Sequence, residues 1–151
     1  MDAPHPRSTA SIFGHPIHPM LVPFPIAFFT LALLMDLAYW QSSNLTWKHF
    51  AEWLLLAGLV CGALAAVAGA VDFFSRREIR ARPPAWPHAI GNVIVMLLAF
   101  FNSLVHARDG WTGVVPTGLA LSFATVLLML VTGWLGGALV FRHGVGVKHH
   151  D

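Results

Sequence analysis

The sequence predicts an all-α, polytopic membrane protein: a bundle of four transmembrane helices with both termini in the cytoplasm. Of its 151 residues, 56% are hydrophobic and only 11% are charged, whereas soluble domains carry about 25% charged residues. Four apolar segments are each long enough to cross a bilayer, which takes about 20 helical residues. Short stretches with turn-forming or helix-breaking residues separate them.

The four segments define the expected domain organisation. We expect spans over residues 21–40, 50–74, 88–107 and 112–141, within a membrane domain over residues 21–143. A polar N-terminal segment with a His-Pro motif precedes it over residues 1–20, and a tail follows over residues 144–151. The N-terminal segment has no apolar stretch typical of a signal peptide, so we expect the first span to stay in the membrane.

Basic residues set the expected orientation. Arg7, four arginines between residues 76 and 82, Arg142 and Lys148 fall on one side of the bilayer, and only Lys48 and Arg108 fall on the other. The positive-inside rule then predicts a multi-pass protein of the bacterial inner (plasma) membrane with both termini inside. The net charge of +2 gives no broad basic face, so we expect the lipid bilayer, and no nucleic acid, as a partner.

Histidine lies near both ends of the third span, on one helical face. His88 and His106 project in the same direction at 100° per residue, with Asn92 and Asn102 each within about 40° of it. Ala99 lies near the middle of this stripe. Polar groups on a spanning helix usually face protein or water, so the stripe is predicted to face the interior of the bundle.

Small residues indicate where helices approach closely. They recur every four residues in the second span and again in the fourth, at Gly58, Gly62, Ala66 and Ala70 and at Gly133 and Gly137. This spacing predicts close packing within the chain, with a homodimer interface as the alternative. Cys61 is the sole cysteine, which excludes an intramolecular disulfide and a thiolate metal cluster.

Ionisable side chains at membrane depth are costly and usually functional. The predicted orientation sorts them into a cytoplasmic group (His15, His18, Asp72, His88 and His143) and an outer group (Asp36, His49, Glu52 and His106). Two arrangements of the His-Pro motif stay open. His15 and His18 lie about 9 Å apart in a polyproline conformation and about 5 Å apart in a helical turn.

Two kinds of site fit these residues. Haem b takes one histidine from each of two facing helices. The candidates are His88 with His18 or His143 at the cytoplasmic face, and His106 with His49 at the outer face. A transition metal ion (Fe, Zn or Cu) would instead take imidazole and carboxylate ligands. That set comprises His15, His18, Asp72, His88 and His143.

Each candidate also has a purely structural interpretation. His106 and His143 lie at predicted helix C-termini, where a histidine can cap carbonyl groups. Asp72 can pair with Arg76 one turn later. No Gly-x-Ser-x-Gly, P-loop, His-Glu-x-x-His or dinucleotide motif is present, so no catalytic residue is predicted.

Several motifs together resemble a known family. They are GHPIHPM at residues 14–20, PFP at 23–25, Asp36, GAVD at 69–72, His88 with Asn92, GWLGG at 133–137 and RHGVGV at 142–147. The chain resembles the bacterial membrane proteins catalogued as domain of unknown function 2231, and the resemblance implies a four-helix inner-membrane domain. In some relatives this domain is joined to a Rieske-type iron–sulfur domain, which implies redox work. This chain lacks the cysteine pairs of such a domain.

The leading hypothesis is a small, redox-linked inner-membrane protein. Its histidine cluster binds haem b or a transition metal and exchanges electrons with a partner protein. Two alternatives remain from the sequence: a transporter or accessory subunit for metal ions or protons, without electron transfer, and a purely structural membrane partner.

Overall fold

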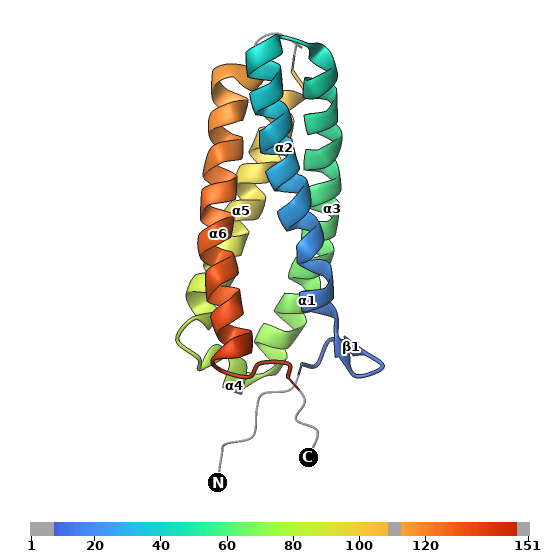
Figure 1. The fold of residues 1–151 in the computed structure, drawn as a ribbon. Coiled ribbons are helices and arrows are strands. Elements are labelled where there is room, and N and C mark those ends of the chain that lie inside the picture. The colour runs from blue at the N-terminus through green and yellow to red at the C-terminus, as the bar shows by residue number, and fades with distance from the viewer. Residues whose placement is uncertain (1–7, 109–112, 148–151) are drawn as a thin grey trace.

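In the computed structural model, which describes residues 8–108 and 113–147, four long helices stand side by side in an elongated bundle (Figure 1). The first is α2 (Pro23–Ser42), which follows the short α1 (Ile17–Leu21) through the helical residue Val22. The others are α3 (Leu45–Ser75), α5 (Ala85–His106) and α6 (Leu119–Phe141). α2 lies beside α3 and α6, and α5 lies beside the same two helices.

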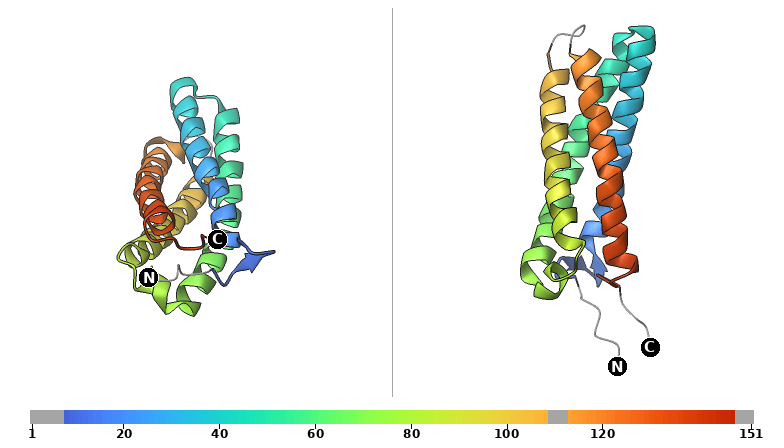
Figure 2. Two further views of the ribbon diagram at one scale, coloured as in Figure 1. Left: turned by 60° about the horizontal axis from the view of Figure 1, so that its bottom comes forward. Right: turned by 90° about the vertical axis from the view of Figure 1, so that its left-hand side faces the viewer.

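Smaller elements connect the long helices. A hairpin of β1 (Ser11–Ile12) and β2 (His15–Pro16) precedes α1, and α4 (Arg77–Arg80) links α3 to α5. The π-helical segment η1 (Val114–Gly118) leads into α6. The hairpin, α4 and the last described residues lie at one end of the bundle, hereafter the terminal end (Figure 2). The α2–α3 turn lies at the opposite end, hereafter the far end.

The expectation of four membrane-spanning helices is confirmed. The candidate spans are Ile17–Ser42, Leu45–Ser75, Ala85–His106 and Val114–Phe141, long and apolar enough by length and composition. The second span begins five residues earlier than expected, because the Asn44 Oδ1 accepts a hydrogen bond from the Thr46 amide at 3.0 Å and caps α3. Residue 112, the expected start of the fourth span, lies outside the described residues.

The predicted polar stripe of α5 faces the interior. Ala99, Asn102 and His106 are completely buried, whereas Ile90, on the opposite side of the helix, is 53% exposed. The apolar core lies at mid-height, where α2, α3, α5 and α6 meet. It comprises Phe29, Ala32, Leu55, Val95, Ala99 and Met129.

The prediction for the small residues holds in part. Gly58 and Gly62 are buried, and a Cβ atom on Gly58 would collide with the Phe29 ring. Ala66 and Ala70 are exposed instead, because the contact face shifts round the helix to Ala65 and Gly69. Close packing at Gly133 and Gly137 was a wrong expectation: a Cβ atom would meet nothing within 4 Å at Gly133 and only Phe141, at 3.9 Å, at Gly137.

Candidate functional site

Two partly buried histidines lie close together at the terminal end of the bundle. The imidazole rings of His18 on α1 and His88 on α5 lie with centroids 6.1 Å apart and planes at 89°. His18 Nδ1 donates to the carbonyl of Ala65 at 2.7 Å, and His88 Nδ1 donates to the carbonyl of Thr132 at 2.9 Å. A carbonyl only accepts, so each Nδ1 carries the proton and leaves Nε2 as the lone-pair nitrogen of the neutral ring.

A glycine makes room for each ring. A Cβ atom on Gly69 would lie 2.9 Å from Nδ1 of His18, and one on Gly136 would lie 2.9 Å from Cε1 of His88. Each glycine stands four residues after the residue whose carbonyl accepts from that ring, Ala65 or Thr132. The backbone carbonyl and the absent side chain therefore fix both the position and the tautomer of each imidazole.

Asn92 holds His88 from one turn further along α5. Its Nδ2 donates to the carbonyl of His88 at 2.8 Å and lies 3.3 and 3.4 Å from the two ring nitrogens. These last two contacts are longer than an ordinary N–H hydrogen bond. Asn92 thus packs against the ring, while the short bond to Thr132 sets its orientation.

The other predicted members of the cytoplasmic group do not join this pair. Asp72 accepts hydrogen bonds from the Ser8 hydroxyl at 2.7 Å and from the Thr9 and Ala10 amides at 2.6 and 2.8 Å. It fastens the N-terminal segment to α3, and Arg76 Nε donates to the Thr9 hydroxyl rather than pairing with Asp72.

The two remaining histidines of that group lie on other elements than the pair. His15 is exposed on β2, and His143 is partly buried just after α6. Within residues 8–108 and 113–147, no three His, Cys, Asp or Glu side chains gather where they could hold a metal ion. The five-residue mixed-ligand site has no support from the structure. Neither of the two expected conformations covers the whole His-Pro motif. His15 is in a strand, and His18 is in a helix.

A second polar cluster lies buried toward the far end. His106 Nε2 is 2.8 Å from Asp36 Oδ1, and both side chains are completely buried. The Ser122 hydroxyl donates to Asp36 Oδ2 at 2.5 Å and accepts from Asn102 Nδ2 at 2.7 Å. His106 Nδ1 donates to the Asn102 carbonyl at 3.0 Å, so one proton remains to be shared between Nε2 and the carboxyl group.

His49 has a different environment. Its side chain is 61% exposed, and its Nδ1 lies 2.9 Å from Glu52, which also pairs with Lys48 at 2.6 Å. His49 and His106 therefore have separate partners, one at the surface and one in the interior. The structure does not join them as an outer pair.

The two helical hairpins repeat one arrangement. Asp36 follows His18 by 18 residues, and His106 follows His88 by the same number. Corresponding residues contact each other across the bundle at both levels, as the His18–His88 and Asp36–His106 pairs. Buried positions correspond too, with an offset of 70 residues from α2 to α5 and of 67 from α3 to α6. They include Phe29 and Ala99, Ala32 and Asn102, Ala51 and Gly118, Leu55 and Ser122, and Ala65 and Thr132. The chain is an internal two-fold repeat.

Both histidines of the terminal pair were predicted from the sequence, but the residues that hold their rings in place were not. Gly69 and Gly136 occur in motifs it did quote, and only the contacts show that each glycine lies against an imidazole. Ser122 gave no signal in an apolar helix. The equal spacing of His18–Asp36 and His88–His106 was the available sign of the repeat.

Four apolar helices around one buried and one partly buried polar layer define a multi-pass membrane protein whose environment is the lipid bilayer. The chain belongs to the family described as "Predicted membrane protein (DUF2231)", whose model matches residues 14–149. This confirms the resemblance seen in the motifs. Comparisons with curated proteins and with solved structures give no match.

Proposed function

We propose that the protein binds a b-type haem between His18 and His88 and works as a small electron-transfer protein of the membrane. The observation that carries the proposal is the neighbouring pair of imidazoles, each with Nδ1 held by a backbone carbonyl. Histidines that ligate a metal almost always donate their other N–H to such a group, because the hydrogen bond fixes the tautomer and makes the ligand more basic.

The separation of the rings supports this assignment. A ligating imidazole nitrogen lies about 2 Å from its metal, and the ring centroid lies about 1 Å further back. Two rings that bind one iron from opposite sides thus have centroids about 6 Å apart, compared with the 6.1 Å between His18 and His88. Two ligands suffice for a haem, since the macrocycle supplies the other four donors, whereas a bare ion needs a larger set.

The residues of the chain have distinct tasks in this proposal. His18 and His88 hold the iron, and the carbonyls of Ala65 and Thr132 keep both rings in the ligating tautomer. The surrounding apolar helices exclude water and stabilise the less charged state of the centre. Bound haem supplies one-electron exchange, which requires a redox partner protein at the membrane surface.

Absorption spectroscopy of the full-length protein tests the proposal. Protein purified in detergent, or loaded with haemin, is expected to show a Soret band with one haem per chain. His18→Ala and His88→Ala are each expected to lose bis-histidine ligation. His49→Ala is the matched control, because that side chain is 61% exposed and away from the pair. If the wild-type chain takes up no haem, or if His88→Ala keeps the wild-type spectrum, the proposal is wrong.

Proton handling is the second candidate, and the Asp36–His106 pair favours it. A buried acid and base that share one proton can pass it between Oδ1 and Nε2 while the Nδ1–Asn102 bond is kept. A proton flux into vesicles that contain the protein, abolished by Asp36→Asn, would support this function. Equal flux in protein-free vesicles would exclude it.

We also propose a bacterial inner-membrane location with the terminal end in the cytoplasm. α4 carries Arg77 and Arg80 at that end, and Arg142 follows α6 there, as the positive-inside rule requires. A reporter that is active only in the cytoplasm is expected to be active when it is fused to the C-terminus. The homodimer stays a further proposal, and native mass spectrometry of the protein in detergent tests it.

A further inference from the structure

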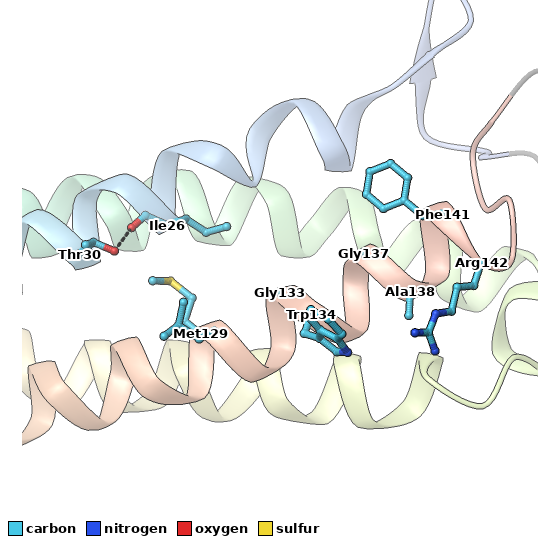
Figure 3. Close-up of a pocket in the computed structure, with 10 residues that line it drawn as sticks. Ile26, Thr30, Met129, Gly133, Trp134, Gly137, Ala138, Phe141 and Arg142 are labelled. Carbon is cyan, nitrogen blue, oxygen red and sulfur yellow. Dashed lines mark hydrogen bonds between the residues drawn. The ribbon is translucent and has the colours of Figure 1, made fainter.

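We propose that the groove between α2 and α6 seats one edge of the haem macrocycle, and that Arg142 pairs with its propionate carboxylates. This inference rests on the proposed function. The groove has a volume of about 590 Å³ and lies at the surface of the bundle (Figure 3). Apolar groups form most of its wall, with one cation. The residues used below are Ile26 and Thr30 on α2, and Met129, Gly133, Gly137 and Arg142 on or next to α6.

Glycine is not required there by contacts within the chain. A Cβ atom on Gly133 meets nothing within 4 Å, and one on Gly137 meets only the Phe141 ring at 3.9 Å. At Gly91, by contrast, a Cβ atom would collide with Thr132. Glycine weakens a helix relative to alanine. The two glycines leave a flat surface on α6 that packs against little else in the described residues. A flat ligand could lie against such a surface.

The internal repeat supplies an independent comparison. Three positions of α3 and α5 that correspond to groove positions carry larger side chains: Phe100 stands for Thr30, Ala66 for Gly133 and Ala70 for Gly137. The two halves carry their methionine on different helices. Met96 on α5 corresponds to Ile26 on α2, and Gly62 on α3 corresponds to Met129 on α6. On that side Met96 packs so close to Gly62 that a Cβ atom there would lie 2.6 Å from its sulfur. At these three positions the α2–α6 side has the smaller residue, whereas Gly62 and Val67 are smaller than their groove counterparts Met129 and Trp134.

The histidine pair contacts or precedes the helices that form the groove, and neither histidine lines the groove itself. His88 lies against Gly136, which is about 60° round α6 from Gly133. His18 lies on α1, immediately before α2, which forms the opposite wall. A planar ring ligated on both faces by these imidazoles must extend sideways between the helices. The α2–α6 groove offers space of about 590 Å³ on one such side.

Arg142 fixes the direction of the macrocycle. Its side chain lies at the terminal end of the groove, beside Ala138 and on the other side of α6 from the Phe141 ring (Figure 3). Two ionised propionates next to lipid need a cationic partner. A guanidinium group binds carboxylates through paired hydrogen bonds. The propionates therefore point to the terminal end and the apolar edge points to Met129.

Haemin titration of the full-length protein in lipid nanodiscs tests the inference. Gly133→Leu and Gly137→Leu fill the groove and are expected to abolish stoichiometric binding. Arg142→Gln is expected to weaken binding about tenfold or more and to lower the reduction potential, because a positive charge near the iron favours the reduced state. Ala124→Leu, which introduces a leucine at an exposed position of α6 outside the groove, is the control and is expected to bind as wild type.

The outcomes separate the two proposals. If the wild type binds no haem, both fall. If it binds haem and loses it in His18→Ala while both glycine variants and Arg142→Gln bind as wild type, the haem site stands and the groove proposal is overturned. A change in oligomeric mass in Gly133→Leu with unchanged haem affinity also overturns it, since the groove would then hold a second copy of the chain.

Discussion

Replacing His106 by alanine tests whether the far-end cluster stabilises the fold. The substitution removes the His106 partner of Asp36, which is completely buried, and leaves the hydrogen bond from the Ser122 hydroxyl. Breaking a buried ion pair from one side costs about 3–5 kcal/mol. We expect a loss of free energy of unfolding in that range for His106→Ala.

Asp36→Asn is the graded comparison. The Asn amide can donate to His106 Nε2 and accept from the Ser122 hydroxyl, so both contacts of Asp36 at 2.8 and 2.5 Å are retained. Only charge assistance is lost, and we expect a cost of about 1 kcal/mol. In the Asp36→Ala/His106→Ala double variant the cost is expected to fall short of the sum of the single variants by about 2 kcal/mol, because the two residues are directly coupled.

Unfolding of the protein in mixed detergent micelles, followed by circular dichroism as the fraction of dodecyl sulfate rises, measures these differences. His49→Ala is the control, since its exposed side chain is expected to contribute no more than about 0.5 kcal/mol. The reasoning is refuted if His106→Ala unfolds at the same dodecyl sulfate fraction as His49→Ala. Strict additivity in the double variant would refute the coupling.

Three further substitutions test contacts described above. Gly136→Ala is expected to displace the His88 ring, because the added Cβ would lie 2.9 Å from it, and to lower haem affinity, whereas Ala124→Gly, at an exposed position of α6 outside the groove, does not; equal affinity would contradict the role of the glycine. Asp72→Asn weakens three hydrogen bonds to the N-terminal segment, and limited proteolysis is expected to cleave that segment faster, with unchanged cleavage as the contrary result. Asn44→Ala removes the cap of α3 and is expected to cost about 1 kcal/mol in the same unfolding assay, where no loss would count against the cap.

Much of the fold was predictable because the signals are local. Apolar runs of membrane-spanning length set the four helices, and the period of 3.6 residues placed Ala99, Asn102 and His106 on the buried face of α5. Helix ends were less accurate, since one side-chain hydrogen bond from Asn44 decides where α3 begins.

The sites were only partly predictable because their partners come from distant parts of the chain. Sequence spacing showed His88 and His18 as candidates but could not show that the second is held by the carbonyl of Ala65, 47 residues away. Asp36 was grouped with His49, Glu52 and His106, whereas in the structure it is completely buried and contacts only His106 of these three residues. A backbone carbonyl leaves no trace in composition or periodicity.

The repeat of the two hairpins has a consequence for the far-end layer. In a dimer of identical hairpins, symmetry would set acid against acid or base against base at that level, and like charges in apolar surroundings repel. Covalent linkage of the halves removes this restriction, so one half can carry Asp36 and the other His106. The terminal layer keeps like residues, which suits a ligand with two equivalent faces. One chain can thus combine a pair of like residues, His18 and His88, at one level with a pair of unlike residues, Asp36 and His106, at the other.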